Sequence, residues 1–137
     1  MSSHGNHGWK ALLLAVLVTA GCGSGSGMVS AGGTVTLDGE PLAGVVVEFR
    51  PVDPGGTPSF GLTDASGRYR LMRTAFESGV VPGNYAIRIY ADSPDNAAIH
   101  CGCELPAVPA RYRARSELRA TVEDRRRQRF DFDLASP

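Results

Sequence analysis

The residues with the most chemical potential are His100-Cys101-Gly102-Cys103-Glu104, which place two thiols, an imidazole and a carboxylate within one short stretch. Thiolates are soft metal ligands and a neighbouring imidazolium lowers the pKa of a thiol, so one interpretation is a metal or thiol-redox site. Cys101 and Cys103 supply two ligands and His100 a third, and no second ligand pair occurs elsewhere, whereas a structural zinc site needs four. The other interpretations are a local disulfide between Cys101 and Cys103, which we favour, and two free thiols. We expect no metal and no other cofactor.

A second set of polar residues could supply oxygen ligands or catalytic groups. Asp64 and Ser66, with Asp38 or Glu40 from another loop, could face calcium, but this ion takes six to eight oxygens and repeated Asp or Asn ligands are missing. An Asx turn accounts for Asp64 without an ion. His100 is the only histidine after residue 21, so no Ser-His-Asp triad can be built. We therefore expect a protein that is not an enzyme.

The beginning of the chain is typical of an export signal. Residues 1–10 are polar with one cation, and residues 11–20 form an apolar run that is too short for a membrane span of about 20 residues. The following Thr19-Ala20-Gly21-Cys22 resembles the lipobox of bacterial lipoproteins, in which the cysteine receives diacylglycerol and becomes the new N-terminus. We expect Cys22 to be lipidated and to anchor an exported protein to a bacterial membrane, facing the periplasm or the cell surface. The alternative is an ordinary signal peptide with an incidental cysteine.

The charge of the chain argues against nucleic acid as a partner. Lys10 is the only lysine, so removal of residues 1–21 would leave 13 arginines against 14 acidic residues. Nucleic-acid binding needs a strong basic field, which this balance does not supply. Two short basic runs, 111–115 and 125–129, could touch anionic lipid or polysaccharide near the anchor, or could be a solvated loop and a charged hairpin turn.

The elements that position these residues are predicted to be strands, because apolar and polar side chains alternate with a period of two. The apolar residues that share a face in each stretch are Val35 and Leu37; Val45, Val47 and Phe49; Phe60 and Leu62; Tyr69 and Leu71; Tyr85, Ile87 and Ile89; Leu118, Ala120 and Val122; and Phe130, Phe132 and Leu134. No stretch after Cys22 has helical periodicity. About seven strands separated by Gly, Pro and Asp turns predict an all-β fold, a two-layer Greek-key β-sandwich.

Three turns organise these strands. Asp38-Gly39 is typical of a two-residue hairpin. In the turn before the strand at Arg68, Asp64 can bond its own backbone and Gly67 can adopt the positive φ that closes the turn. Pro82-Gly83 forms a further turn into the strand that begins at Tyr85.

Three runs of the chain combine these turns with strands: residues 33–49, with Gly39-x-Pro41-Leu42 at their centre, residues 63–71 and residues 81–87. Together they resemble the carboxypeptidase regulatory-like domain, a transthyretin-like (prealbumin-like) sandwich, over nearly all of the chain after the linker. Pro109-Ala110-Arg111-Tyr112 and the ending from Phe130 to Leu134 are similar to a group of small bacterial lipoproteins built on that domain alone. The resemblance implies a fold rather than an activity.

The sequence therefore predicts a signal peptide (1–21), a lipidated cysteine with a flexible Gly/Ser linker (22–31) and a β-sandwich domain (32–137). We expect a non-catalytic, membrane-anchored envelope module that binds a protein or a polysaccharide, or that supports envelope structure. The alternative is a thiol-redox or metal-binding envelope protein using residues 100–103. The connection from Asp92 to Ser116, about 25 residues long, is the predicted contact surface, since long loops on a rigid sandwich carry recognition.

Overall fold

The structure, a computed structural model, describes residues 27–93 and 106–137, and within these ranges the chain is all-β, as predicted. It has nine strands and one short 3-10 helix there, and no α-helix. The elements are β1 (Ser30–Leu37), β2 (Glu40–Pro41), β3 (Val45–Pro51), β4 (Ser59–Leu62), β5 (Arg68–Arg70), β6 (Gly83–Ala91), η1 (Ala110–Tyr112), β7 (Arg119–Val122), β8 (Arg127–Arg129) and β9 (Phe132–Leu134).

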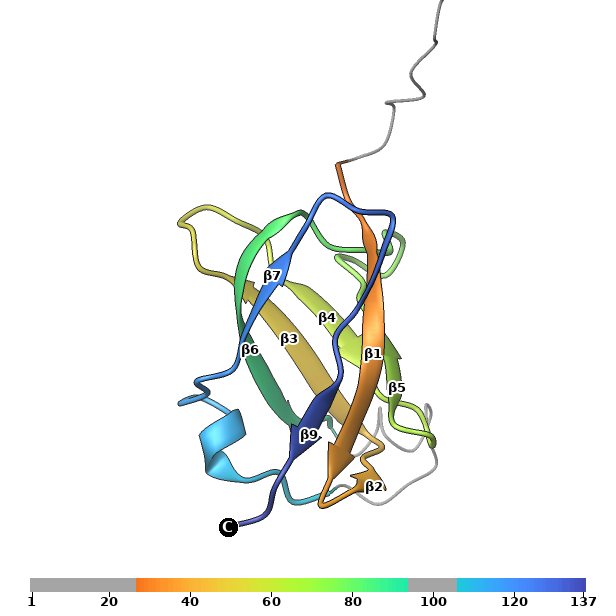
Figure 1. Cartoon of the computed structure of the whole chain (residues 1–137), viewed down its shortest axis with the longest axis vertical. Coiled ribbons are helices and arrows are strands. Elements are labelled where there is room, and N and C mark those ends of the chain that lie inside the picture. The colour runs from red at the N-terminus through yellow and green to blue at the C-terminus, as the bar shows by residue number, and fades with distance from the viewer. Residues whose placement is uncertain (1–26, 94–105) are drawn as a thin grey trace, which may run out of the picture.

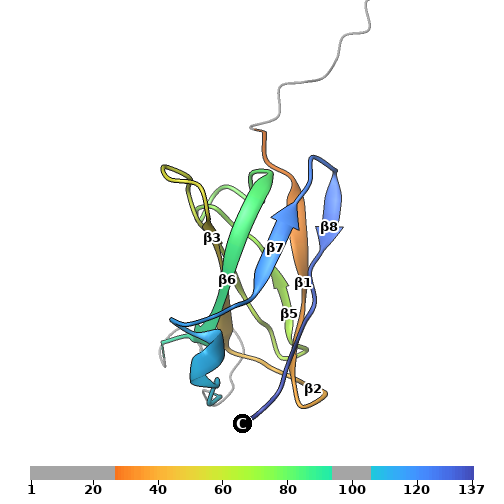
Figure 2. The same cartoon turned by 60° about the vertical axis from the view of Figure 1, so that its left-hand side comes forward.

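The strands form two sheets that pack face to face as a sandwich (Figures 1 and 2). One sheet has the order β4-β3-β6-β7 and is antiparallel throughout. The other is built around β1, with β2 and β5 antiparallel along one side and β8 and β9 parallel along the other. β1 therefore holds four short strands in register.

Strand β8 differs from the sequence prediction. The run 125–129 reads as a charged turn, but its second half pairs with β1, Ser30 opposite Arg127 and Gly32 opposite Arg129. A strand tolerates these charges because alternate residues share a face, so both arginines point to solvent while Gln128 between them is partly buried.

Two glycines allow β1 to be approached closely from both sides. A Cβ added at Gly32 would lie 2.4 Å from the carbonyl oxygen of Tyr69, and one added at Gly33 would lie 2.0 Å from the carbonyl oxygen of Phe130. Real Cβ atoms do not come this close to oxygen. A larger residue at either glycine would therefore push β5 or the segment before β9 away from β1.

The core lies between the sheets and is centred on Phe49, whose ring centroid is 5.4 Å from that of Phe130 and 5.7 Å from that of Tyr85. The predicted inward faces are confirmed for β3, β5 and β6. The buried apolar residues are Val29, Ala31, Val35, Leu42, Val45, Val47, Phe49, Tyr69, Leu71, Val80, Tyr85, Ile87, Ile89, Val108, Val122, Phe132 and Leu134.

Strand β4 is arranged with its large apolar residues outward. Ser59 is buried and Gly61 faces the core, whereas Phe60 and Leu62 share the outer face of the sheet. The reason is the ring of Tyr69, which fills the space inside β4 so closely that a Cβ on Gly61 would lie 2.6 Å from its Cδ2 atom. The inner position of β4 therefore accepts only small residues.

The longer strands run between two ends of the sandwich, which we call its poles (Figure 1). The N-terminal pole contains the start of the described chain, the connection 52–58 after β3, residues 71–82 between β5 and β6, and the β7–β8 connection 123–126. The C-terminal pole contains Asp38-Gly39, the turn 63–67, η1 and residues 135–137.

Candidate functional site

The stretch 100–104 and the proposed lipidation residue Cys22 lie outside the described residues. Within the residues that the structure describes, no three His, Cys, Asp or Glu side chains gather in a way that could hold a metal ion. The same part of the chain contains no helix of the length and hydropathy that crossing a bilayer requires.

Two of the carboxylates considered as calcium ligands, Asp64 and Asp38, have backbone partners. The Asp64 Oδ1 accepts hydrogen bonds from the backbone amides of Ser66 at 2.9 Å and Arg68 at 3.0 Å, as in an Asx turn. Gly67 closes this turn with φ 75°. Asp38 Oδ1 accepts from the amide of Ser136 at 2.9 Å. Hydrogen bonding to Ser136, chiefly to its side chain and then to its backbone, lowers the pKa of Asp38.

The Pro82-Gly83 turn is closed by a tyrosine. The hydroxyl of Tyr85 donates to the carbonyl of Val81 at 2.5 Å, while the ring packs against Phe49. Gly83 has φ 155°, which a residue with a side chain rarely adopts. The turn therefore has a structural role at the start of β6.

A groove on the outer face of the β1 sheet gathers basic side chains, and we name it the arginine trough. Its floor is the outward row of β1, Ser30, Gly32 and Thr34. The strands on either side supply its walls, which carry Arg68 and Arg70 from β5 and Arg127 and Arg129 from β8. The groove encloses about 340 Å³.

One of the four wall arginines is neutralised. The Nε atom of Arg129 lies 2.8 Å from the Oδ2 atom of Asp131, and Asp131 also accepts the backbone amide of Thr34 at 2.8 Å. The hydrogen bond from Arg129 lowers the pKa of Asp131, and the same bond raises the pKa of Arg129. For the other three, Arg68, Arg70 and Arg127, the described residues provide no ion pair or side-chain hydrogen bond.

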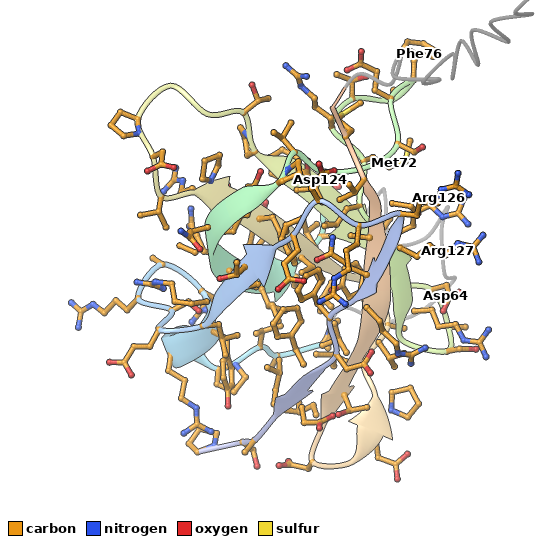
Figure 3. The ribbon with its side chains drawn as sticks, turned by 45° about the horizontal axis from the view of Figure 1, so that its top comes forward. Asp64, Met72, Phe76, Asp124, Arg126 and Arg127 are labelled. Carbon is orange, nitrogen blue, oxygen red and sulfur yellow. The ribbon has the colours of Figure 1, made fainter. Side chains whose placement is uncertain are left out.

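Three exposed apolar side chains lie in connections of the N-terminal pole. Phe76 is 96% exposed, Val52 57% and Val81 40%, and all three lie in connections of that pole. Figure 3 shows Phe76 at the outer limit of the molecule. The turn that presents Phe76 is held by Thr74, whose hydroxyl accepts the amides of Phe76 at 3.2 Å and Glu77 at 3.1 Å.

The outer face of the other sheet carries an apolar hollow of about 480 Å³ beside β4, lined in part by Val46, Phe60, Leu62 and Met72. Phe60 lies opposite Glu48 in the register of β4 and β3. Glu48 is only 6% exposed, and its carboxylate lies 3.4 Å from the guanidinium of Arg88. The alternation of the sequence did not predict this hollow, because it favoured Phe60 and Leu62 on the inner face of β4.

The part of the predicted contact loop that the structure describes, residues 106–116, lies at the C-terminal pole. Arg111 and Tyr112 of η1 hold the end of the chain there, because the Arg111 guanidinium donates to the carbonyl of Ala135 and the Tyr112 hydroxyl accepts the Ala135 amide at 3.0 Å. Both residues also line a hollow of about 570 Å³ with Leu118.

Sequence reasoning recognised the basic residues 125–129 but not the trough. The two walls come from segments about 60 residues apart, and only the register on β1 brings them together. The pair of glycines at positions 32 and 33 is the signal in the sequence that could have indicated close approach on both sides of β1. In comparisons with known proteins, no family model, no curated protein and no solved structure matches this chain.

Proposed function

We propose that this protein is a lipid-anchored, non-catalytic module of the bacterial cell envelope, built on a Greek-key sandwich of the carboxypeptidase regulatory-like, transthyretin-like type. Cys22 carries the lipid and the folded domain stands at the membrane surface. The linker between them is shorter than the 22–31 expected from the sequence, because Val29 and Ala31 are buried in the core and β1 begins at Ser30. Its partner is a protein or a polysaccharide of the envelope.

The observation that supports this proposal is the position of the exposed apolar residues. The described chain begins at the same pole at which Phe76, Val52 and Val81 face the solvent. A linker of a few residues after a lipidated cysteine would hold this pole against the bilayer, where apolar side chains gain from leaving water. The C-terminal pole, with the described part of the loop from Asp92 to Ser116, would then face away from the membrane.

The anchor is tested by Cys22→Ser. We expect this variant to lose its acyl chains, to escape processing by the lipoprotein pathway and to move from the membrane fraction to the soluble fraction. Cys101→Ser is the matched control, since it makes the same Cys-to-Ser change away from the proposed lipidation position, and it should stay with the membrane. Acyl mass spectrometry and cell fractionation give the readout, and a Cys22→Ser protein that still sediments with membranes would show that another feature anchors the chain.

The state of Cys101 and Cys103 distinguishes the proposal from the alternative function. Titration and metal analysis of the purified protein should find neither reactive thiols at Cys101 and Cys103 nor a bound metal, because we expect these residues to form a local disulfide. Two thiols of low pKa, or stoichiometric metal, would replace the proposal with the thiol or metal protein.

A further inference from the structure

We propose that the arginine trough binds an acidic polysaccharide, laid along β1 with its negative groups between the guanidinium groups of β5 and β8. This inference deepens the proposed function, because it names the ligand class of the envelope module. It does not depend on the lipid anchor.

The register of the sheet places an anion position at Gly32. Arg70 of β5 and Arg129 of β8 both lie opposite this glycine, one on each side. Neighbouring strands are about 4.8 Å apart, so the two arginine backbones are about 10 Å apart across a floor position that has no side chain. Because Arg129 is already paired with Asp131, a carboxylate, sulfate or phosphate at that position would be bound by Arg70 from one wall and by Arg127, two residues before Arg129 in β8, from the other.

The trough fits a polymer better than a single anion. Arg68 and Arg70 follow each other along one wall, and Arg127 and Arg129 along the other, with about 7 Å between residues two apart in a strand. The positive charges therefore repeat along the groove, which suits a polymer whose negative groups also repeat. The hydroxyls of Ser30 and Thr34 line the same floor and suit the hydroxyl groups of a sugar chain.

The same geometry disfavours other polyanions. β1 is paired on both sides, so its floor offers no free strand edge to which an extended acidic peptide could add. The aromatic residue of the lining, Tyr69, is 6% exposed and gives no surface for stacking the bases of a nucleic acid. A flat bilayer would touch the walls and leave the recessed floor empty.

The overall charge of the domain makes this site selective. After removal of residues 1–21 the chain has one more acidic residue than arginines, so a polyanion gains nothing from the average field of the protein. Binding therefore depends on the local cluster, in which Arg127 lies beside Arg126 at the top of β8 (Figure 3).

The test measures binding of polygalacturonate to the protein purified in a neutral detergent. We expect binding that weakens as salt rises, and no binding of neutral dextran. Arg70→Ala and Arg127→Ala should each weaken binding about tenfold, and the double variant more, because each removes charged hydrogen bonds to the polymer. Arg113→Ala makes the same charge change at an exposed position of the C-terminal pole, and it should bind as the unchanged protein does.

Circular dichroism checks that each variant is folded. The double variant Arg70→Lys with Arg127→Lys should retain part of the affinity for polygalacturonate, because the positive charges remain. Polyglutamate should bind more weakly than polygalacturonate, and micelles containing phosphatidylglycerol should not displace the polysaccharide. Equal loss in Arg113→Ala, equal binding of polyglutamate, displacement by phosphatidylglycerol, or no binding of polygalacturonate would each overturn the proposal. None of these results would bear on the Cys22 anchor, whose own test is the fractionation above.

Discussion

At the scale of single residues, Tyr69 joins the two sides of β1. Its ring is buried against Phe132 and its hydroxyl donates to the carbonyl of Phe130 at 2.5 Å, across the strand between them. Burial raises the pKa of Tyr69 above its ordinary value. A sequence can show that this tyrosine faces inward, and alternation predicted that, but the acceptor lies 61 residues away and no local pattern indicates it.

Tyr69→Phe should lower the free energy of unfolding by about 1–2 kcal/mol, because the ring stays and the carbonyl of Phe130 loses a buried partner. Urea unfolding measures the change. Tyr90→Phe is the control, since its hydroxyl makes no hydrogen bond within the described residues, and it should change stability by less than about 0.5 kcal/mol. Equal effects in both variants would mean that the Phe130 bond is not what stabilises the fold.

The raised pKa of Tyr69 also predicts a pH dependence. The unfolded chain ionises this hydroxyl near pH 10 while the folded chain keeps the proton, so its contribution is complete below pH 10 and is lost as the pH rises towards the folded pKa. Between pH 9 and about pH 11.5, the free energy of unfolding should fall by about 2 kcal/mol less in Tyr69→Phe than in the unchanged protein. Parallel curves would contradict this.

At the scale of elements, β1 carries the second sheet. The hairpin at its end follows from Asp38-Gly39, whose φ angles of 51° and 84° are those of a two-residue turn with two left-handed positions. The sequence predicted this turn and the inward faces of the longer strands, since both depend on local chemistry. It could not show that Phe60 of β4 points outward, because that orientation depends on the ring of Tyr69, which comes from another strand.

Gly33→Ala should destabilise the protein by about 1–3 kcal/mol or more, since its Cβ would meet the Phe130 carbonyl and force β1 away from the segment that leads into β9. Thermal and urea unfolding provide the measurement. Ser30→Ala changes an exposed position of the same strand and should have little effect. A Gly33→Ala protein of full stability would mean that the close approach of these two segments is not required.

At the scale of the whole molecule, the two poles differ, and the difference implies an orientation of the sandwich relative to the membrane. The N-terminal pole combines the start of the described chain with exposed apolar side chains, and the C-terminal pole holds the end of the chain on η1. The sequence predicted the linker and the sandwich separately. It could not show that Val52, Phe76 and Val81 lie at the same pole, because they belong to two connections and only the antiparallel order of the strands places both at one end.

Phe76→Trp tests whether the N-terminal pole faces the membrane. The chain has one tryptophan, Trp9, in the segment expected to be removed, so the new residue would be the sole indole of the processed protein. In the lipidated protein on phosphatidylcholine vesicles we expect blue-shifted emission that brominated lipid quenches, because the ring enters the bilayer surface. Arg113→Trp at the C-terminal pole should keep the emission of an indole in water, and equal quenching at both positions would exclude the proposed orientation.

The position of β1 between β5, β8 and β9 has a consequence for how the chain is made. Ser30 faces Arg127 and Leu37 faces Leu134, so an early strand finds two of its neighbours only when synthesis is nearly complete. Until then the backbone groups along that side of β1 are unsatisfied, and any nascent strand of another molecule can pair with them. Because of β1, this protein is therefore prone to aggregate while it is being synthesised, rather than to lose its fold once it is complete.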